Sequence, residues 1–358
     1  MLIPLTLMDL HVGDDDITPD KDYKHVFKRL RNALLREKGI LVNGIWITPA
    51  IIQAHLRDAG HTNSHIHSVF NPEDKQDVTL AYNLLRDIWT LPPEPIDHRA
   101  GFLAARKSLK VFGTLCYCLV YPYICVDMPL SEQLEHLSAA AHLTLVLYAC
   151  NGARAQFIPT SLYIDIMIMI KNVYFCVAKT KADLPNDQFF IVLLGTDRLE
   201  TLFGILRTMV GNDANLDILQ LALRLTGTTD VANILARHPE WDKGPRRLHL
   251  PIVARDPAVL PDAADHINPG LWKADTFVKN VSLASCWKNG RRSVEDQQPF
   301  SIEILAQIES ATHPSVFAPC GAFLFDLPFS EDDLEDHDTQ DVLKDAMSPN
   351  GEDSMEGI

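Results

Sequence analysis

The chain has 358 residues, of which 47% are hydrophobic and 22% charged, and its formal net charge is −15. A chain of this length and apolar content can bury a large core, and its acidic balance argues against broad, non-specific binding of nucleic acids. Most of the acidic excess lies in residues 331–358, which contain eleven Asp or Glu and one Lys, so we expect a disordered acidic tail there.

Cysteine usage indicates a reduced, intracellular protein. The seven cysteines form no CxxC pair and no finger-like Cys/His spacing. The first residues, MLIPLTLMDLHV, lack the basic flank of a signal peptide. The longest apolar run, 158–177, is interrupted by Asp165 and Lys171. We therefore expect it to be a buried helix of the core rather than a membrane span.

The first predicted helix begins at Asp22, after a segment of strand-like content at residues 2–12. Apolar residues recur along it at helical spacing: Val26, Phe27, Leu30 and Leu34. Six cations surround its other side: Lys24, Lys28, Arg29, Arg31, Arg36 and Lys38. This basic face is a candidate surface for phosphates, although a charged helix face is more often simply solvated.

Short connections follow this helix. The Asn-Gly pair within 40–47 suits a tight hairpin turn. Two cap-then-proline pairs then predict helices over 49–57 and 73–90. Between these helices lie three histidines: His61, His65 and His67. They could ligate a metal, but no Cys or carboxylate falls at a matching spacing, so we interpret them as part of a polar connecting loop.

The middle of the chain is predicted to be helical. Long apolar-periodic segments favour helices over 98–121, 131–150 and 159–182. Their Met and aromatic residues are more typical of a core than of a cofactor site. The apolar run Phe189–Leu194 has the length of a buried strand.

The stretch 195–215 predicts a capped amphipathic helix. Thr196 is a candidate cap, and a stripe of apolar residues is expected to face a core: Leu199, Leu202, Phe203 and Leu206. Glu200 lies off the centre of this stripe, near the positive end of the helix dipole, where it could hold a cation or be an ordinary surface acid. Gly211 then supplies a stop.

The remaining segments are less regular in sequence. A helix of about 216–226, a Thr-rich break at 227–229 and a helix to residue 236 are expected. Residues 246–330 hold many Pro and short apolar pieces, which is typical of an irregular accessory region.

Two of these segments, read together, resemble one family. DYKHVFKRLRN, from Asp22, has Asp, His, Lys, Arg and Asn at the offsets of the segment around the second catalytic Asp of P-element and THAP-type DDE transposases. TDRLETLFGILRTMVGN, from Thr196, resembles that family's stretch with the final catalytic Glu, and both occur in the right order. HIHSVFNPEDKQDVTLAYNLL, from His65, is similar to the segment between them, and to transposase-like reading frames of basidiomycete fungi.

The resemblance implies a fold and a chemistry. The family has an RNase H-like α/β catalytic core that is interrupted by a large helical insertion. Asp22 would be the second metal-binding catalytic acid and Glu200 the final one, holding Mg²⁺ or Mn²⁺ for cleavage and joining of DNA. Lys28 and Arg31 would meet the DNA backbone. Asp197 matches an Asp at the family's GTP site, although a plain acid at a helix start is an equal interpretation.

One departure from the family limits these expectations. The family's first catalytic Asp lies on an early strand well upstream, but only 21 residues precede Asp22 here. Asp9 and Asp14 to Asp16 are too close in sequence to occupy that strand. We therefore expect a mainly α protein with an incomplete RNase H-like core, which binds metal weakly and lacks robust activity alone.

The expected organisation has five parts: a core remnant (1–40), a helical insertion (41–190), the final-Glu segment (191–245), the accessory region (246–330) and the acidic tail (331–358). The function expected is that of a fragment or degenerate descendant of a DDE transposase, with a nuclear location if transposase-derived and a cytoplasmic one otherwise. The alternative is a non-enzymatic helical binding or scaffold protein that associates with DNA or protein partners.

Overall fold

The structure is a computed structural model that describes residues 1–13, 17–150, 154–208, 217–238, 250–256, 269 and 272–319. By its internal contacts the chain divides into two compact units. The first comprises Met1–Gly195 and Leu248–Ser330, and the second comprises Thr196–Arg247 and Glu331–Ile358. The predicted acidic tail, Asp14 to Asp16 and the predicted helix stop at Gly211 lie outside the described residues.

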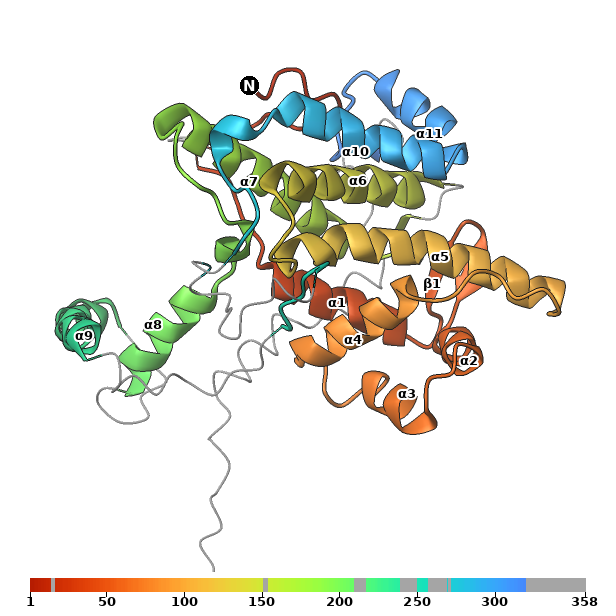
Figure 1. Cartoon of the computed structure of the whole chain (residues 1–358), viewed down its shortest axis with the longest axis horizontal. Helices are drawn as coiled ribbons and strands as arrows, with labels where there is room; N and C mark the ends of the chain where they lie inside the picture. The colour runs from red at the N-terminus through yellow and green to blue at the C-terminus, as the bar shows by residue number, and fades with distance from the viewer. Residues whose placement is uncertain are drawn as a thin grey trace, which may run out of the picture. The chain divides into compact units, whose positions relative to one another are not determined.

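The first unit is built mainly from α-helices (Figure 1), as predicted. Its α-helices are α1 (Tyr23–Leu35), α2 (Pro49–Asp58), α3 (Asn63–Val69), α4 (Val78–Trp89), α5 (Ala100–Val120), α6 (Leu130–Ala149), α7 (Thr160–Asp183), α10 (Leu283–Gln297) and α11 (Phe300–Glu309). Short 3-10 turns lie between helices in the described part of the chain: η2 (Tyr121–Tyr123), η4 (Arg154–Gln156), η5 (Ile191–Leu194) and η9 (Val278–Asn280). Within the described residues the one sheet is the hairpin of β1 (Ile40–Val42) and β2 (Ile45–Ile47).

The hairpin forms where the Asn-Gly pair predicted it. Its strands are antiparallel, with Leu41 opposite Trp46. Asn43 and Gly44 both have positive φ, 50° and 77°. Two left-handed residues give a turn whose twist matches that of the flanking strands, and Asn and Gly are the residues that tolerate it best. This small sheet is not the sheet of an RNase H-like core.

Side-chain caps set the helix starts. Thr48 caps α2, as predicted, by accepting the N–H of Ile51. The start of α4 was predicted wrongly, because the helix begins at Val78 and not near residue 73. There the Asp77 carboxylate accepts two N–H groups, from Thr79 at 2.6 Å and from Leu80 at 3.0 Å. Acidic capping therefore overrides the earlier Asn-Pro signal.

The prediction that the three histidines lie in a connecting loop is wrong, because they lie in and beside a helix. Thr62 caps α3, so that His65 and His67 are helical, and His61 lies between α2 and α3. The short helix buries Ile66 and Val69, and it packs against α2 and α4.

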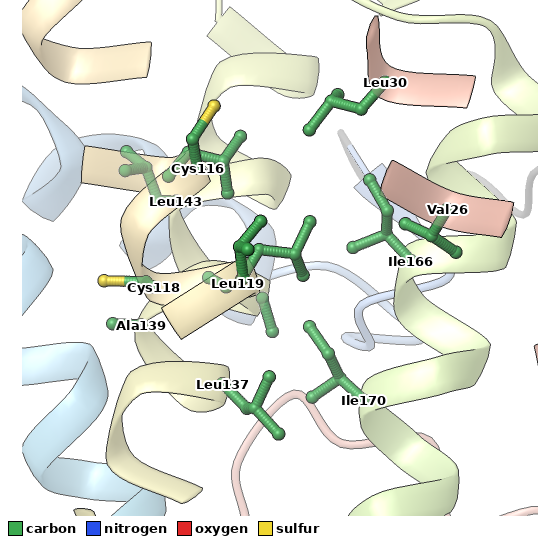
Figure 2. Packing of buried hydrophobic residues seen from close by; sticks show 14 of the residues in the cluster. Val26, Leu30, Cys116, Cys118, Leu119, Leu137, Ala139, Leu143, Ile166 and Ile170 are labelled. Atoms are coloured by element: carbon green, nitrogen blue, oxygen red, sulfur yellow. The ribbon is translucent and has the colours of Figure 1, made fainter. Parts of the chain in front are cut away.

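The core lies where α5, α6 and α7 meet α1. Figure 2 shows Leu119 of α5 between side chains of α6 and α7, while Val26 of α1 lies beside Ile166 of α7. By length and composition α7 could cross a membrane, but 72% of its apolar window is buried inside the fold. Apolar packing on several sides gives α7 the surroundings of a core helix.

The predicted irregular region instead supplies two helices to this core. Both α10 and α11 pack against α6, and Figure 1 shows α10 lying alongside it. The close approach depends on Gly290, since a Cβ at that position would lie 2.4 Å from the Glu135 carbonyl oxygen. Ser138 Oγ of α6 also donates to the Trp287 carbonyl of α10, at 2.7 Å. The many Pro residues around these helices had led to the prediction of an irregular region.

Neither of the two strand-like stretches forms a strand. Residues 2–12 are irregular, with short turns, and they are held by a hydrogen bond from Trp287 Nε1 to the Thr6 carbonyl at 2.7 Å. The apolar run Phe189–Leu194 ends in η5, whose Ile191 and Val192 are buried. Both runs are apolar because they pack on helices and not because they pair in a sheet.

The second unit contains α8 (Asp197–Thr208) and α9 (Ile218–Arg237), which pack on each other. The expected Thr-rich break in α9 does not occur, and the hydroxyls of Thr228 and Thr229 bond back to carbonyls one turn earlier within the continuous helix. The α8 stripe was expected to face a core. Leu206 is buried, but Leu199 and Phe203 are exposed to 54% and 42%.

Candidate functional site

Asp22 forms the N-terminal cap of α1. Its Oδ1 accepts the backbone N–H groups of Lys24, at 2.6 Å, and His25, at 3.3 Å. The residue is 7% exposed. Charge on this carboxylate is favoured by the helix dipole as well as by these hydrogen bonds. Asp22 is therefore both a structural cap and an acid held rigidly at the edge of a buried corner.

Three neighbours complete this corner. Tyr23 stacks on Tyr123, with ring centroids 4.3 Å apart. Gly195 lies on the Oδ2 side of Asp22, where a Cβ on the glycine would stand 3.6 Å from that oxygen. Asp20 lies close enough for the Asp22 charge to act on it. We call the group of Asp20, Asp22, Tyr123 and Gly195 the Asp22 corner.

The electrostatics of the Asp22 corner favour a cation. Asp20 is exposed at the rim of the corner, where partial desolvation, and to a smaller degree the charge of Asp22, raises its pKa, although hydrogen bonds from Lys21 and Asn172 act in the other direction. Burial also raises the pKa of Tyr123 well above its ordinary value, and the charges of both Asp residues raise it further. The Tyr123 hydroxyl has no hydrogen-bond partner among the described residues. A bound cation would relieve the repulsion between the two carboxylates.

Glu200 lies in the first turn of α8, one turn after Thr196. The Thr196 hydroxyl donates to Glu200 Oε1 at 3.2 Å, and the Glu200 N–H donates to the Thr196 carbonyl at 2.9 Å. The side chain is exposed. Asp197 is the first residue of the same helix. Both acids therefore sit at the positive end of the α8 dipole, as the sequence predicted.

The structure corrects the expectation that Arg31 contacts DNA. Arg31 is 0% exposed. Its guanidinium donates to three backbone carbonyls, those of Val69 at 3.1 Å, Asn71 at 2.7 Å and Asp74 at 2.7 Å. These bonds fasten α1 to the connection between α3 and α4. A phosphate could reach the Arg31 guanidinium only if the α3–α4 connection separated from α1.

The rest of the basic face is also engaged within the fold. Lys28 Nζ donates to Gln76 Oε1 at 3.0 Å but stays partly exposed. Arg29 pairs with Asp165 of α7 and donates to Ser161 at 2.8 Å. Sequence periodicity marked these cations as one surface, whereas Lys28, Arg29 and Arg31 tie α1 to other elements. Lys28 is the predicted DNA contact that remains accessible.

The sequence interpretation missed three members of the Asp22 corner. Asp20 is only two residues from Asp22, and this spacing was the one signal that could have identified it. Tyr123 and Gly195 reach the corner only through the tertiary fold. Comparison with protein-family models, with curated proteins and with solved structures finds no match for this chain.

Proposed function

We propose that the chain derives from a DDE-type transposase and that Asp22 and Glu200 share one divalent cation at the DNA backbone. The supporting observation is the position of Gly195 beside the carboxylate of Asp22. Gly195 ends the first segment of the first unit, and Glu200 follows five positions later in the sequence. The chain therefore enters the Glu200 segment from a point beside the other acid.

The chemistry of this proposal is metal-dependent phosphoryl transfer. Carboxylates are the ligands that Mg²⁺ and Mn²⁺ prefer, and cleavage of DNA by two metal ions needs acids on both sides of the scissile phosphate. Asp22 and Glu200 would hold a single ion, whereas the two-metal reaction uses two. We accordingly propose that the protein binds DNA with the help of this ion and cleaves it slowly. An RNase H-like ancestry, a nuclear location and a GTP-facing role for Asp197 belong to the same proposal.

Metal-dependent DNA binding tests it. The experiment measures binding of the full chain to a fluorescent DNA duplex by anisotropy, with Mn²⁺ and with a chelator. We expect Mn²⁺ to strengthen binding severalfold, and Asp22→Asn or Glu200→Gln to remove that gain. Nicking of supercoiled plasmid in the same buffer should be slow and absent in both variants. Equal affinity with and without Mn²⁺ would contradict the proposal, and so would a gain that survives Glu200→Gln.

A second candidate, a non-enzymatic helical binding protein, is favoured by α9. This helix exposes large apolar side chains: Ile218, Leu219, Leu223, Val231 and Ile234. Exposed apolar groups of this size are typical of protein interfaces. The double variant Leu219→Glu and Leu223→Glu separates the candidates, because it leaves both predicted metal ligands in place. Sedimentation velocity at rising concentration tests the simplest partner, a second copy. Association that the variant loses supports this candidate, and a monomer throughout contradicts it.

A further inference from the structure

A second group of metal-ligating side chains lies away from the Asp22 corner, where α2, α3 and α4 meet. His61 follows α2, and its N–H donates to the Leu56 carbonyl at 3.0 Å. His65 lies in the first turn of α3, where the Thr62 hydroxyl accepts its N–H at 3.2 Å. Asp87 comes from the last turn of α4 and is 1% exposed. All three side chains are thus attached to well-packed backbone.

The two imidazole rings approach a single carboxylate oxygen, Oδ2 of Asp87. His65 Nε2 lies 2.5 Å from Asp87 Oδ2, and His61 Nδ1 lies 4.0 Å from the same atom. The two imidazole rings stack at 5.2 Å with an angle of 20° between their planes. One ligand atom from each residue lies within 4.8 Å of the other two. We call this group the His-His-Asp cluster.

A hydrogen bond between His65 and Asp87 does not by itself explain the cluster. That bond needs one imidazole, whereas a second imidazole stands parallel to the first and turns a ring nitrogen toward the same oxygen. The other oxygen of Asp87 has a different partner, Arg86, at 3.2 Å. An ion pair to the oxygen that does not bind the metal fixes the orientation of a metal-binding carboxylate. Arg86 leaves Oδ2 directed at the two histidines.

The donor set selects the class of ion. Two imidazole nitrogens and one carboxylate oxygen are ligands of Zn²⁺ and its neighbours, whereas Mg²⁺ and Ca²⁺ prefer oxygen alone. Donor atoms around a tetrahedral Zn²⁺ stand about 3.3 Å apart, given metal–ligand bonds of about 2.0 Å. The separations in the cluster bracket this value, so small side-chain rotations would bring all three donors to the ion.

We propose that His61, His65 and Asp87 bind one divalent transition-metal ion of the Zn²⁺ class. Three protein ligands leave a fourth coordination position for water or an exchangeable ligand. The ion also joins the α2–α3 region to α4, because the two histidines lie 22 or more positions from Asp87 in the sequence. Since the unfolded chain does not hold the three donors together, binding stabilises the folded state. This site is independent of the proposed DNA-linked function.

Titration of the purified full chain, free of any affinity tag, with Zn²⁺ tests the site by isothermal calorimetry. Co²⁺ is the second probe, because a tetrahedral Co²⁺ ion with these ligands absorbs visible light strongly. We expect one tight Zn²⁺ equivalent per chain and a rise in melting temperature with metal. His61→Ala and His65→Ala should each weaken binding at least about tenfold and reduce the Co²⁺ absorption.

His67→Ala is the matched control, because His67 is exposed on the same helix but outside the cluster. It should change the affinity by less than about twofold. His61 is partly exposed, so its replacement keeps the fold, which circular dichroism without metal verifies. Asp22→Asn should leave Zn²⁺ binding unchanged. The proposal fails if no Zn²⁺ binds, if His61→Ala and His65→Ala bind as the parent does, or if His67→Ala loses as much affinity as they do.

Discussion

Gly195 lies against Asp22, and a Cβ added to the glycine would stand 3.6 Å from Asp22 Oδ2 and 3.0 Å from Tyr23 Cε1. The φ angle of Gly195 is −75°, an ordinary value for any residue. Space, and not backbone conformation, therefore disfavours a larger residue here. The glycine lets the backbone at residue 195 pass directly beside the acid that caps α1.

Replacing Gly195 by Val should disturb the Asp22 corner. The added side chain must displace the Tyr23 ring or the carboxylate, and over-packing of this kind typically costs about 1 to 3 kcal/mol. We expect a lower melting temperature and a smaller gain in DNA affinity from Mn²⁺ than in the parent. Thermal unfolding and the anisotropy assay measure the two effects. An unchanged melting temperature would show that the corner has room for a larger residue.

Arg31 and Lys28 should behave differently when each is changed to Ala. Loss of the Arg31 guanidinium removes three hydrogen bonds to backbone carbonyls, one buried and two partly buried, which should lower the free energy of unfolding by about 3 kcal/mol. Lys28→Ala removes one partly exposed hydrogen bond and should cost less than about 1 kcal/mol. Urea unfolding gives both values. If Lys28 contacts DNA, its variant alone should weaken binding while the fold stays stable, whereas equal losses of stability would refute the structural role of Arg31.

Gly290 and Gly101 form a matched pair in two helices. A Cβ at Gly290 would meet the Glu135 carbonyl at 2.4 Å and Ser138 Cβ at 2.5 Å, so Gly290→Ala must push α10 away from α6. We expect a loss of about 2 kcal/mol or more. Nothing lies within 4 Å of a Cβ at Gly101 in α5, and Ala there should be neutral or stabilise by up to about 1 kcal/mol. Chemical denaturation should rank the two variants in this order. A neutral Gly290→Ala would contradict the close packing of α10 on α6.

Stability should fall as the pH is lowered below neutrality, because two buried histidines resist protonation. Burial lowers the pKa of His55 and of His142 to about 4 from an ordinary value of about 6.5, and the charge of Arg106 contributes at His55. Between these values the unfolded chain binds more protons than the folded one. Stability is thus complete above about pH 6.5 and falls toward pH 4, by up to about 3 kcal/mol for each histidine.

One group in the Asp22 corner acts in the opposite direction. The pKa of Asp20 is raised in the folded state, so protonation of Asp20 stabilises the fold as the pH falls, but only weakly because the residue is exposed to solvent. The destabilisation from the two histidines exceeds the stabilisation from one carboxyl, so the free energy of unfolding should fall as the pH is lowered. Urea unfolding from pH 7.5 to 4.5 measures it. His142→Leu should reduce the slope by about one proton, and a variant with the parent's slope would show that His142 takes up its proton in the folded state.

Local signals in the sequence predicted most of the helices of the first unit. Helix starts and turns depend on a few neighbouring residues, and this range was enough to begin the first helix at Asp22 and to place the turn at Asn43 and Gly44. The same range was too short for α10, whose place in the core depends on Gly290 meeting α6, about 150 positions away. Only the fold could show that contact.

The candidate sites show the same division. Asp22 and Glu200 were singled out by the pattern of residues around them, whereas Gly195 and Tyr123 join Asp22 only through tertiary packing. The histidines were set aside because no carboxylate lay at a metal-binding spacing in the sequence. Asp87 supplies that carboxylate from α4, across a helix–helix contact that periodicity cannot reveal.

The central claim is that Asp22 and Glu200 hold one cation in common, and a double-mutant cycle on Mn²⁺ affinity tests it most directly. Free Mn²⁺ is measured by electron paramagnetic resonance in a His65→Ala background, so that the His-His-Asp cluster does not contribute. If the ion is shared, Asp22→Asn and Glu200→Gln each weaken binding, and the double variant is no weaker than either one. Additive losses, or a Glu200→Gln variant that binds Mn²⁺ as its parent does, would contradict the claim.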